Sequence, residues 1–347
     1  NTTSGAITMT MPSGSAGAIV SIQDYNKTFD SNALTIQPAS GEKINGGTAD
    51  GDLIIATEGQ GLTFVYVDGT VGWKTVHENE FTQGGSDFIV ATGGTITTSG
   101  NDTIHTFTGP GTFAVCKLAV CAANNKISYM VVAGGGGGGA NHGGGGGAGG
   151  FRETKSPVTP YTASPLDGSP SAPNIITVTA TSYPITVGAG GASTPSSPGA
   201  GNPGSNSIFS TVTSAGGGGG GKSASPASSG GSGGGSGDTG PGDPGGAGNT
   251  PPVSPPQGNN GGACGHSAPD YGQGGGGGAT AVGVNGTPTA GGCGGAGAAT
   301  SISGSPTTYA GGGGGSTYQG GTTCKGQGGT GGGGLGTIGG PAPNQRC

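Results

Sequence analysis

Solid runs of glycine recur through the second part of this chain and restrict its possible folds more than any other feature. Residues 134–347 hold 72 of the 90 glycines, so one residue in three of this stretch is glycine. Collagen needs glycine strictly at every third position. Gly237 and Gly240 keep that spacing, but Asp243 breaks it. The longest runs lie at residues 134–139, 143–147, 216–221, 274–278, 311–315 and 331–334.

A flexible, disordered linker is the main alternative for so much glycine. Disordered segments typically carry high net charge, whereas residues 134–347 hold only ten charged side chains. Glycine loses more conformational freedom on folding than any other residue, so hydrogen bonds must compensate. A polyproline-II helix directs its N–H and C=O groups outward, and glycine lets such helices approach closely enough to exchange these bonds. The runs therefore predict a bundle of packed polyglycine-II helices.

The chain before the runs has the composition of an ordinary β protein. Residues 1–80 are predicted to form a small all-β module, because short β-branched and aromatic runs alternate with turn residues. Asp68-Gly69, between apolar residues 62–67 and 70–76, predicts a two-residue hairpin turn. Trp73, the only tryptophan, is predicted to pack in the core of this module. Expected strands include residues 18–22, 34–37 and 53–56.

The remaining boundaries follow from changes in composition. Residues 81–100 are polar and punctuated by glycine, which predicts a connector. Residues 101–133 hold further β segments, and the apolar residues 127–132 enter the first glycine run directly. Residues 134–347 form the predicted polyglycine-II domain with variable surface loops. The expected fold class is mainly β and irregular, with N-terminal β modules followed by the bundle of packed helices.

Nothing in the sequence predicts an enzyme. Residues 216–221 with Lys222 and Ser223 match the phosphate-binding pattern G-x4-G-K-[ST], but Pro226 follows where a nucleotide-binding fold needs a helix. The four histidines show no metal-binding spacing and carboxylates are sparse after residue 134, so no metal or cofactor is expected. A formal charge of −6 gives no reason to expect nucleic acid, and no apolar run is long enough for membrane insertion.

Six cysteines, an even number, lie mostly in glycine-rich sequence typical of loops. Disulfides formed outside the cell are the favoured interpretation over free thiols, and six cysteines allow 15 pairings. Connectivity therefore stays open. The disulfide candidates are Cys116, Cys121, Cys264, Cys293, Cys324 and Cys347.

The order of several segments resembles glycine-rich domains of bacteriophage tail fibres. Residues 128–139 (SYMVVAGGGGGG) and then 143–152 resemble the opening of such domains, and residues 183–191 (YPITVGAGG) and 204–218 look like their next blocks. Residues 49–74 are similar to small β modules of phage fibres. The resemblance implies a receptor-binding tip protein, in which a polyglycine-II sandwich presents loops that bind bacterial surface receptors.

The expected function is thus a structural and receptor-recognition protein of a phage tail fibre, extracellular and part of the virion. Its partners would be a bacterial surface glycan or outer-membrane protein, other fibre or tail subunits, and further copies in a homo-oligomer, with a trimer common in such fibres. The alternative function is that of a secreted or cell-surface structural fibre, and that of an ice-binding protein is less favoured. Candidate receptor contacts are His266, Asp270, Tyr271, Tyr309 and Tyr318, although the tyrosine rings could equally cover edges of the bundle.

Overall fold

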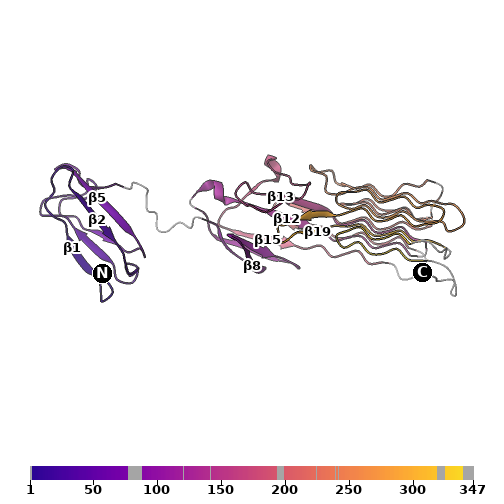
Figure 1. Cartoon of the computed structure of the whole chain (residues 1–347), viewed down its shortest axis with the longest axis horizontal. Helices are drawn as coiled ribbons and strands as arrows, with labels where there is room; N and C mark the ends of the chain where they lie inside the picture. Colours follow the sequence, from indigo (N-terminus) through magenta and orange to yellow (C-terminus); the bar gives the residue numbers. More distant parts are fainter. Residues whose placement is uncertain are drawn as a thin grey trace. The chain divides into compact units, whose positions relative to one another are not determined.

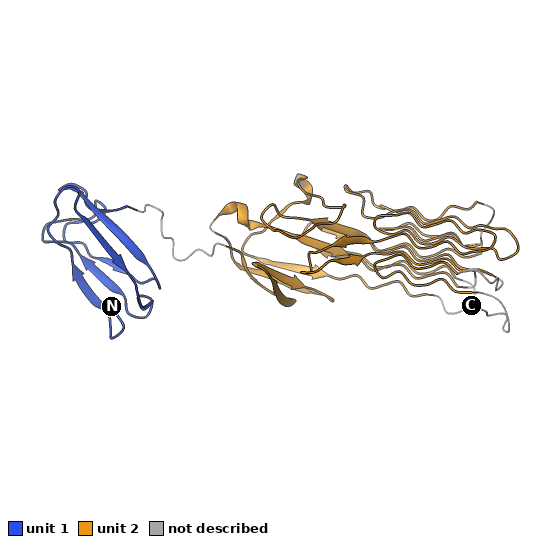
Figure 2. Ribbon diagram, viewed as in Figure 1, with its two compact units in different colours: residues 1–85 blue, residues 86–347 orange. Residues whose placement is uncertain are grey.

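A computed structural model describes residues 2–76, 88–119, 121–140, 142–193, 199–223, 225–238, 240, 242–318 and 325–338. The chain divides into two compact units, Asn1–Gly85 (unit 1) and Ser86–Cys347 (unit 2), which Figure 2 shows in different colours. The boundary falls inside the predicted connector.

Unit 1 is a sandwich of two three-stranded sheets. One sheet has the order β1 (Ile7–Thr10), β3 (Leu34–Gln37), β4 (Leu53–Ile55), and the other has the order β2 (Ile19–Gln23), β5 (Gly61–Asp68), β6 (Gly72–Thr75). β1 runs parallel to β3, and the other pairs are antiparallel. Alternating residues of both sheets face inward, as a half-buried strand requires.

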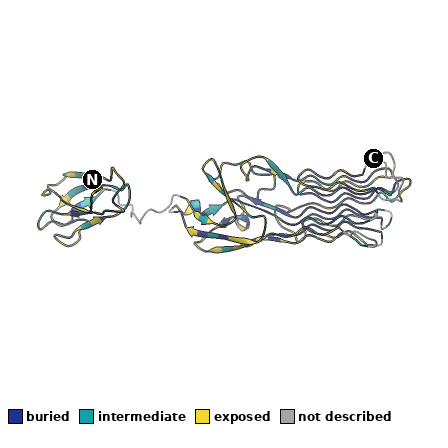
Figure 3. Ribbon diagram, turned by 90° about the horizontal axis from the view of Figure 1, so that it is seen from below, coloured by how far each residue is buried: buried dark blue, intermediate teal, exposed yellow. Residues whose placement is uncertain are grey.

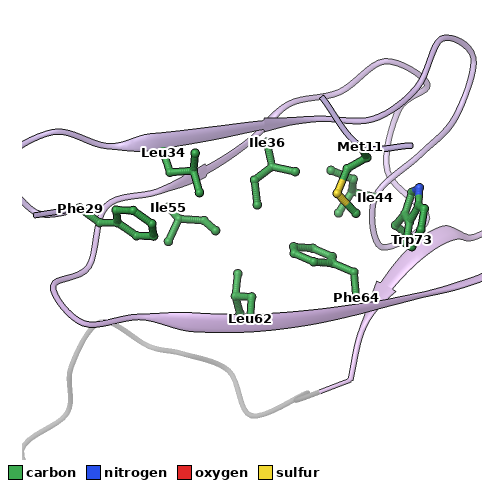
Figure 4. Packing of buried hydrophobic residues seen from close by; sticks show 9 residues of the cluster. All are labelled: Met11, Phe29, Leu34, Ile36, Ile44, Ile55, Leu62, Phe64 and Trp73. Carbon is green, nitrogen blue, oxygen red and sulfur yellow. The ribbon is translucent and has the colours of Figure 1, made fainter. Parts of the chain in front are cut away.

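The core of unit 1 lies between these sheets. Figure 4 shows Leu34, Ile36 and Ile55 of one sheet facing Leu62 and Phe64 of the other. Trp73 is fully buried, which confirms its predicted place, and its Nε1 donates to Glu42 Oε2 at 3.0 Å.

The β5–β6 hairpin is present, but its predicted two-residue turn is wrong. The connection spans residues 69–71, because the Asp68 carboxylate accepts hydrogen bonds from the amides of Thr70 and Val71 at 2.8 Å. Gly72, not Gly69, adopts the positive φ, of 71°. The aspartate side chain thus stabilises a longer turn.

Unit 2 begins with strands where a connector was expected. β7 (Val90–Thr92) and β8 (Thr95–Ser99) lie within residues 81–100. β8 pairs with β9 (Asp102–Thr106), and β7 pairs with β10 (Gly111–Lys117). β-branched threonine and isoleucine favour strands even in this polar context. β7 forms one edge of a five-stranded sheet of order β17 (Val212–Ser214), β16 (Ser207–Phe209), β15 (Ser182–Thr186), β10, β7.

Shorter elements complete this region. Two-stranded sheets pair β11 (Lys126–Ile127) with β14 (Ile176–Thr177), β12 (Tyr129–Val132) with β13 (Phe151–Thr154), and β18 (Ala298–Thr300) with β19 (Thr307–Tyr309). The 3-10 turns are η1 (Ala122–Asn125) and η2 (Ala172–Asn174). A second core packs inward-facing residues of the sheets together, namely Phe113, Val115, Tyr129, Val131, Ile176, Val178, Phe209 and Val212.

The predicted bundle of packed helices is wrong. Within the part of the chain that the structure describes, η1 and η2 are the only helical residues, and the glycine runs are extended segments. The reason is where the hydrogen bonds go. Run 134–139 donates to other segments, with Gly136 N bonded to Gly147 O at 2.8 Å and Gly137 N to Asn202 O at 2.9 Å. The bonds leave the run, as expected, and no bond within a run winds its described residues into α-helical or 3-10 turns, so they stay extended. The coarser expectation, mainly β and irregular, is confirmed.

These hydrogen bonds repeat every third residue. Gly134 and Gly137 donate to Ser205 and Asn202 of one neighbouring segment, while Gly136 and Gly139 donate to Gly147 and Gly144 of another. Successive residues therefore face different neighbours. Most of the interior segments are buried, as Figure 3 shows.

Glycine is required where these segments meet. A Cβ placed on Gly219 would lie 1.7 Å from the Gly201 carbonyl oxygen, and one on Gly144 would lie 1.9 Å from the Gly235 carbonyl oxygen. Both contacts are far below van der Waals distance, and the opposing atoms are backbone. Only a residue without a side chain lets the backbones approach closely enough to bond.

The glycine-rich segments run back and forth between two ends of unit 2. At the sheet end they join β12, β13, β18 and β19, and at the opposite end, here called the loop end, turns connect them (Figure 1). Hydrogen bonds place the loop-end turns beside one another: Ser316 N donates to Gly143 O, and Gln273 N donates to Ser316 O. Turns that are distant in sequence are thereby gathered at one place.

Candidate functional site

Four of the five predicted receptor contacts lie together at the loop end. His266, Asp270 and Tyr271 belong to one turn, and Tyr318 follows the segment that ends at Ser316. The Tyr318 amide donates to the Asp270 carbonyl at 2.8 Å, which joins the two turns. Asp270 itself is buried, and its amide donates to Pro288 O at 2.8 Å.

The aromatic rings of this region form a connected row. The Tyr271 ring lies 6.1 Å from that of Tyr318 and 6.4 Å from that of His266, measured between centroids. His142, from a third turn, places its ring 4.0 Å from that of Tyr318. These are edge-to-face contacts, a geometry that aromatic rings favour. The half-buried rings leave part of their surface to solvent.

Charged groups flank the aromatic row. Asp238, from a fourth turn, bonds through Oδ1 to His266 Nδ1. Burial and the nearby Lys222 hold the pKa of His142 below 6.5, although Asp238 acts in the opposite direction. We call His142, Asp238, His266, Asp270, Tyr271 and Tyr318 the loop-end cluster.

Three residues of the loop-end cluster adopt left-handed backbone conformations. The φ angles are 61° at His142, 32° at His266 and 45° at Tyr271. A residue with a Cβ at positive φ is uncommon, and such strain gathers preferentially at functional sites. Neighbouring contacts must hold these turns in place, since the local backbone does not favour them.

Tyr309 is not part of the loop-end cluster. It lies on β19 at the sheet end, its hydroxyl donates to Ser303 Oγ at 3.2 Å, and its ring packs against the small core of Phe151, Ala279 and Ala298. A cluster at the loop end therefore cannot include it.

His142 and Asp238 were not among the residues predicted to act in recognition. Each follows a glycine run in sequence. The signal that could have found them is the alternating direction of successive segments, which places every second turn at the same end.

The predicted disulfides are absent among the described cysteines. Cys116, Cys121, Cys264 and Cys293 are free thiols. Cys264 is buried and its Sγ donates to the Gly240 carbonyl at 3.1 Å. Cys324 and Cys347 lie outside the described residues. Over the described residues, the extended segments are joined by backbone hydrogen bonds, not by sulfur bridges.

The arrangement offers a surface for binding. Within the described residues, no three His, Cys, Asp or Glu side chains gather as metal ligands, and no helix is long and apolar enough to cross a membrane. Lys222, from the phosphate-binding pattern, exchanges backbone bonds with Ser225 in a turn where a nucleotide-binding fold would begin a helix.

The loop-end cluster presents ring edges and faces beside hydrogen-bonding groups, which suits stacking on sugars or packing against a protein loop.

Comparison with known proteins adds one finding. The model of a protein family described as a glycine-rich domain matches residues 107–346. A search of curated proteins finds no match. The matched region covers the five-stranded sheet from β10 onward and nearly all of the glycine-rich segments.

Proposed function

The chain belongs to the glycine-rich domain family, and we propose that it is a structural and receptor-recognition protein of a phage tail fibre. In this proposal the extended glycine segments are the support, and the loop end meets a bacterial surface glycan or outer-membrane protein. The protein acts outside the cell, as part of a virion and together with other fibre subunits.

The observation that carries the proposal is the loop-end cluster. Tyr271 and Tyr318 come from different turns, yet their rings adjoin and are flanked by His142 and His266. Aromatic residues dominate binding energy at recognition surfaces, because a rigid ring supplies large contact area at low entropic cost. Turns at the tips of rigid segments can also change in sequence without disturbing the segments.

The resemblance to phage fibres supports the same conclusion. Residues 128–139 and 204–218 are similar to fibre domains in which loops bind the host, and these residues form β12 with the first run and β16–β17 with the run that follows. These two segments belong to unit 2, whereas residues 49–74, which are similar to other fibre modules, belong to unit 1.

The test compares how strongly variants that lack different tyrosines bind to bacterial surfaces. The full chain is labelled and presented to immobilised surface glycans and outer-membrane vesicles from a panel of bacteria. The double variant Tyr271→Ala/Tyr318→Ala is expected to bind any positive surface at least about tenfold more weakly, as for loss of an aromatic hot spot. Tyr25→Ala, which removes a tyrosine 90% exposed in unit 1, is the matched control and should bind like the wild type.

Two results would contradict the proposal. One is equal binding by the loop-end double variant and the wild type. The other is linear polymerisation of the purified chain without binding to any bacterial surface, which would favour a structural fibre. Thermal unfolding of each variant separates lost binding from lost folding.

A further inference from the structure

Two backbone donors along the first glycine run have no hydrogen-bond partner among the described residues. Gly134, Gly136, Gly137 and Gly139 each donate an amide hydrogen bond to a neighbouring segment. Across the ranges that the structure describes, the amides of Gly135 and Gly138 donate none. Because the bonding pattern repeats every third residue, both amides belong to the same face of the segment. One face of this segment therefore has no hydrogen-bonded neighbour among the described residues.

This face opens onto a groove in the side of unit 2. The groove has a volume of about 200 Å³, and it lies between the segments around residues 135–138, 145–148, 311–314 and 332–335. Almost all of its lining is glycine backbone, and the exposed Leu335 is also among the lining residues. In the adjoining run, Gly146 also donates no hydrogen bond to the described residues.

Gly135, Gly138 and Gly334, which line the groove, differ from glycines inside the bundle in what a Cβ would meet. At Gly135 and Gly138 the nearest atom would lie 3.6 and 3.8 Å away, which is ordinary contact, and at Gly334 nothing lies within 4 Å. At the interior position Gly137 the Ala192 carbonyl oxygen would lie only 2.3 Å away. Packing within the chain thus explains glycine at 137 but not at 135 or 138. A close approach by something outside the chain would explain it.

We propose that the groove binds one extended, glycine-rich segment of a second polypeptide chain. The N–H groups of Gly135 and Gly138 repeat at the spacing by which Gly134 and Gly137 already bond Ser205 and Asn202 of a neighbouring segment. If an incoming extended segment has the same three-residue period, its carbonyl oxygens repeat at the spacing of these N–H groups and can accept their hydrogen bonds. Glycine in that segment permits the required distance, as it does between segments of this chain.

The groove lies on the side of the segments, and the inference is independent of receptor recognition. It identifies a lateral contact through which this protein can join another chain. The mode is the counterpart of strand addition at a sheet edge, in which main-chain hydrogen bonds supply the affinity. Free backbone donors need a partner, and an added segment satisfies several of them together.

The experiment uses the full chain and a fluorescein-labelled peptide copying residues 215–222 (AGGGGGGK). Fluorescence anisotropy is expected to show saturable binding, and a control peptide with alanine at the six glycines should not bind. The double variant Gly135→Ala/Gly138→Ala places two methyl groups in the groove without an internal clash. It should bind the glycine peptide at least about tenfold more weakly.

Gly190→Ala is the matched control variant. Its Cβ would also lie at ordinary contact, 3.7 Å from the Gly135 carbonyl oxygen, but Gly190 does not line the groove. It should bind the peptide like the wild type. Amide exchange gives a second readout, since the amides of Gly135, Gly138 and Gly146 should gain protection when the peptide binds.

No saturable binding by the wild type, or equal binding of glycine and alanine peptides, would overturn the proposal. So would undiminished binding by the folded double variant. Should that variant fail to fold, amide protection in the wild type decides, and unchanged exchange at these three glycines rejects the groove.

Discussion

Gly137 and Gly138 are neighbours in one glycine run, yet substitution by alanine is expected to have opposite effects on stability. A Cβ at Gly137 would lie 2.3 Å from the oxygen and 2.6 Å from the carbon of the Ala192 carbonyl. Both atoms are backbone, so no rotamer change relieves the clash. At Gly138 the nearest atom would lie 3.8 Å away.

The expected changes in the free energy of unfolding follow from which neighbouring segment must shift to accept the methyl group. To accept a methyl at position 137, the neighbouring segment must shift, which strains the hydrogen bonds from Gly191 N to Gly135 O and from Asn202 N to Ala192 O. Overpacking costs about 1–3 kcal/mol, and each weakened hydrogen bond about 0.5–1.5 kcal/mol. Alanine offsets about 0.4–1 kcal/mol by restricting the unfolded chain. Gly137→Ala is therefore expected to cost about 3 kcal/mol in free energy of unfolding, and Gly138→Ala to gain about 0.4–1 kcal/mol.

Urea unfolding of the full chain measures both effects. Near-UV circular dichroism of the tyrosines follows unit 2, where six of the eight lie beyond residue 86, while fluorescence of Trp73 follows unit 1. Gly137→Ala should lower the unit 2 midpoint by about 1 M or more, and the Trp73 transition should not move. Equal midpoints for the two variants would refute the claim that only the inward face of each segment requires glycine.

Two further predictions concern pH. Burial acts to raise the pKa of Asp24, but the backbone amides of Phe29, Thr28 and Gly59 donate to its carboxylate and hold the pKa below 3.8. A lowered carboxyl pKa stabilises the fold above 3.8 and loses that effect as pH falls below it, so unit 1 should weaken in acid by Trp73 fluorescence, and Asp24→Asn should flatten this dependence. For His142, whose half-buried ring has a pKa below 6.5, the unfolded state takes up a proton first as pH falls through 6.5. Amide protection factors at the loop end, taken relative to intrinsic exchange rates at each pH, should therefore fall below that pH in the wild type but not in His142→Phe, and equal protection in both would contradict the role of this ring.

The strands of unit 1 were predictable because their side chains carry the signal. Predicted residues 34–37 match β3, and predicted residues 53–56 match β4 within one residue, since alternating apolar residues face a single core. β1 was missed because ITMT follows a polar start and finds its partner, β3, 27 residues further on. The longer turn after β5 was missed because Asp68 caps it through its side chain.

The glycine-rich part was less predictable because glycine carries no side-chain pattern. The runs predicted close contact of backbones and hydrogen bonds that leave each run, but not the extended conformation of the segments or which segments would be neighbours. The loop-end cluster depends on the direction of each segment, which no single turn specifies. Tyr309 was grouped with Tyr271 and Tyr318 by residue type. The chain crosses unit 2 an odd number of times between Tyr271 and Tyr309, so Tyr309 lies at the sheet end.

The strained turns of the loop end depend on the extended segments beneath them. Left-handed φ at His142, His266 and Tyr271 costs of order 1–3 kcal/mol at each residue. The segments that carry these turns are held by backbone bonds such as Gly145 N to Gly274 O and Gly235 N to Gly145 O, which involve no loop side chain. The loops can therefore hold unfavourable conformations, and change in sequence, while the segments keep their register. Because the groove beside Gly135 and Gly138 lies along the segments, a change in the turns would alter the proposed receptor surface and leave the proposed lateral contact unchanged.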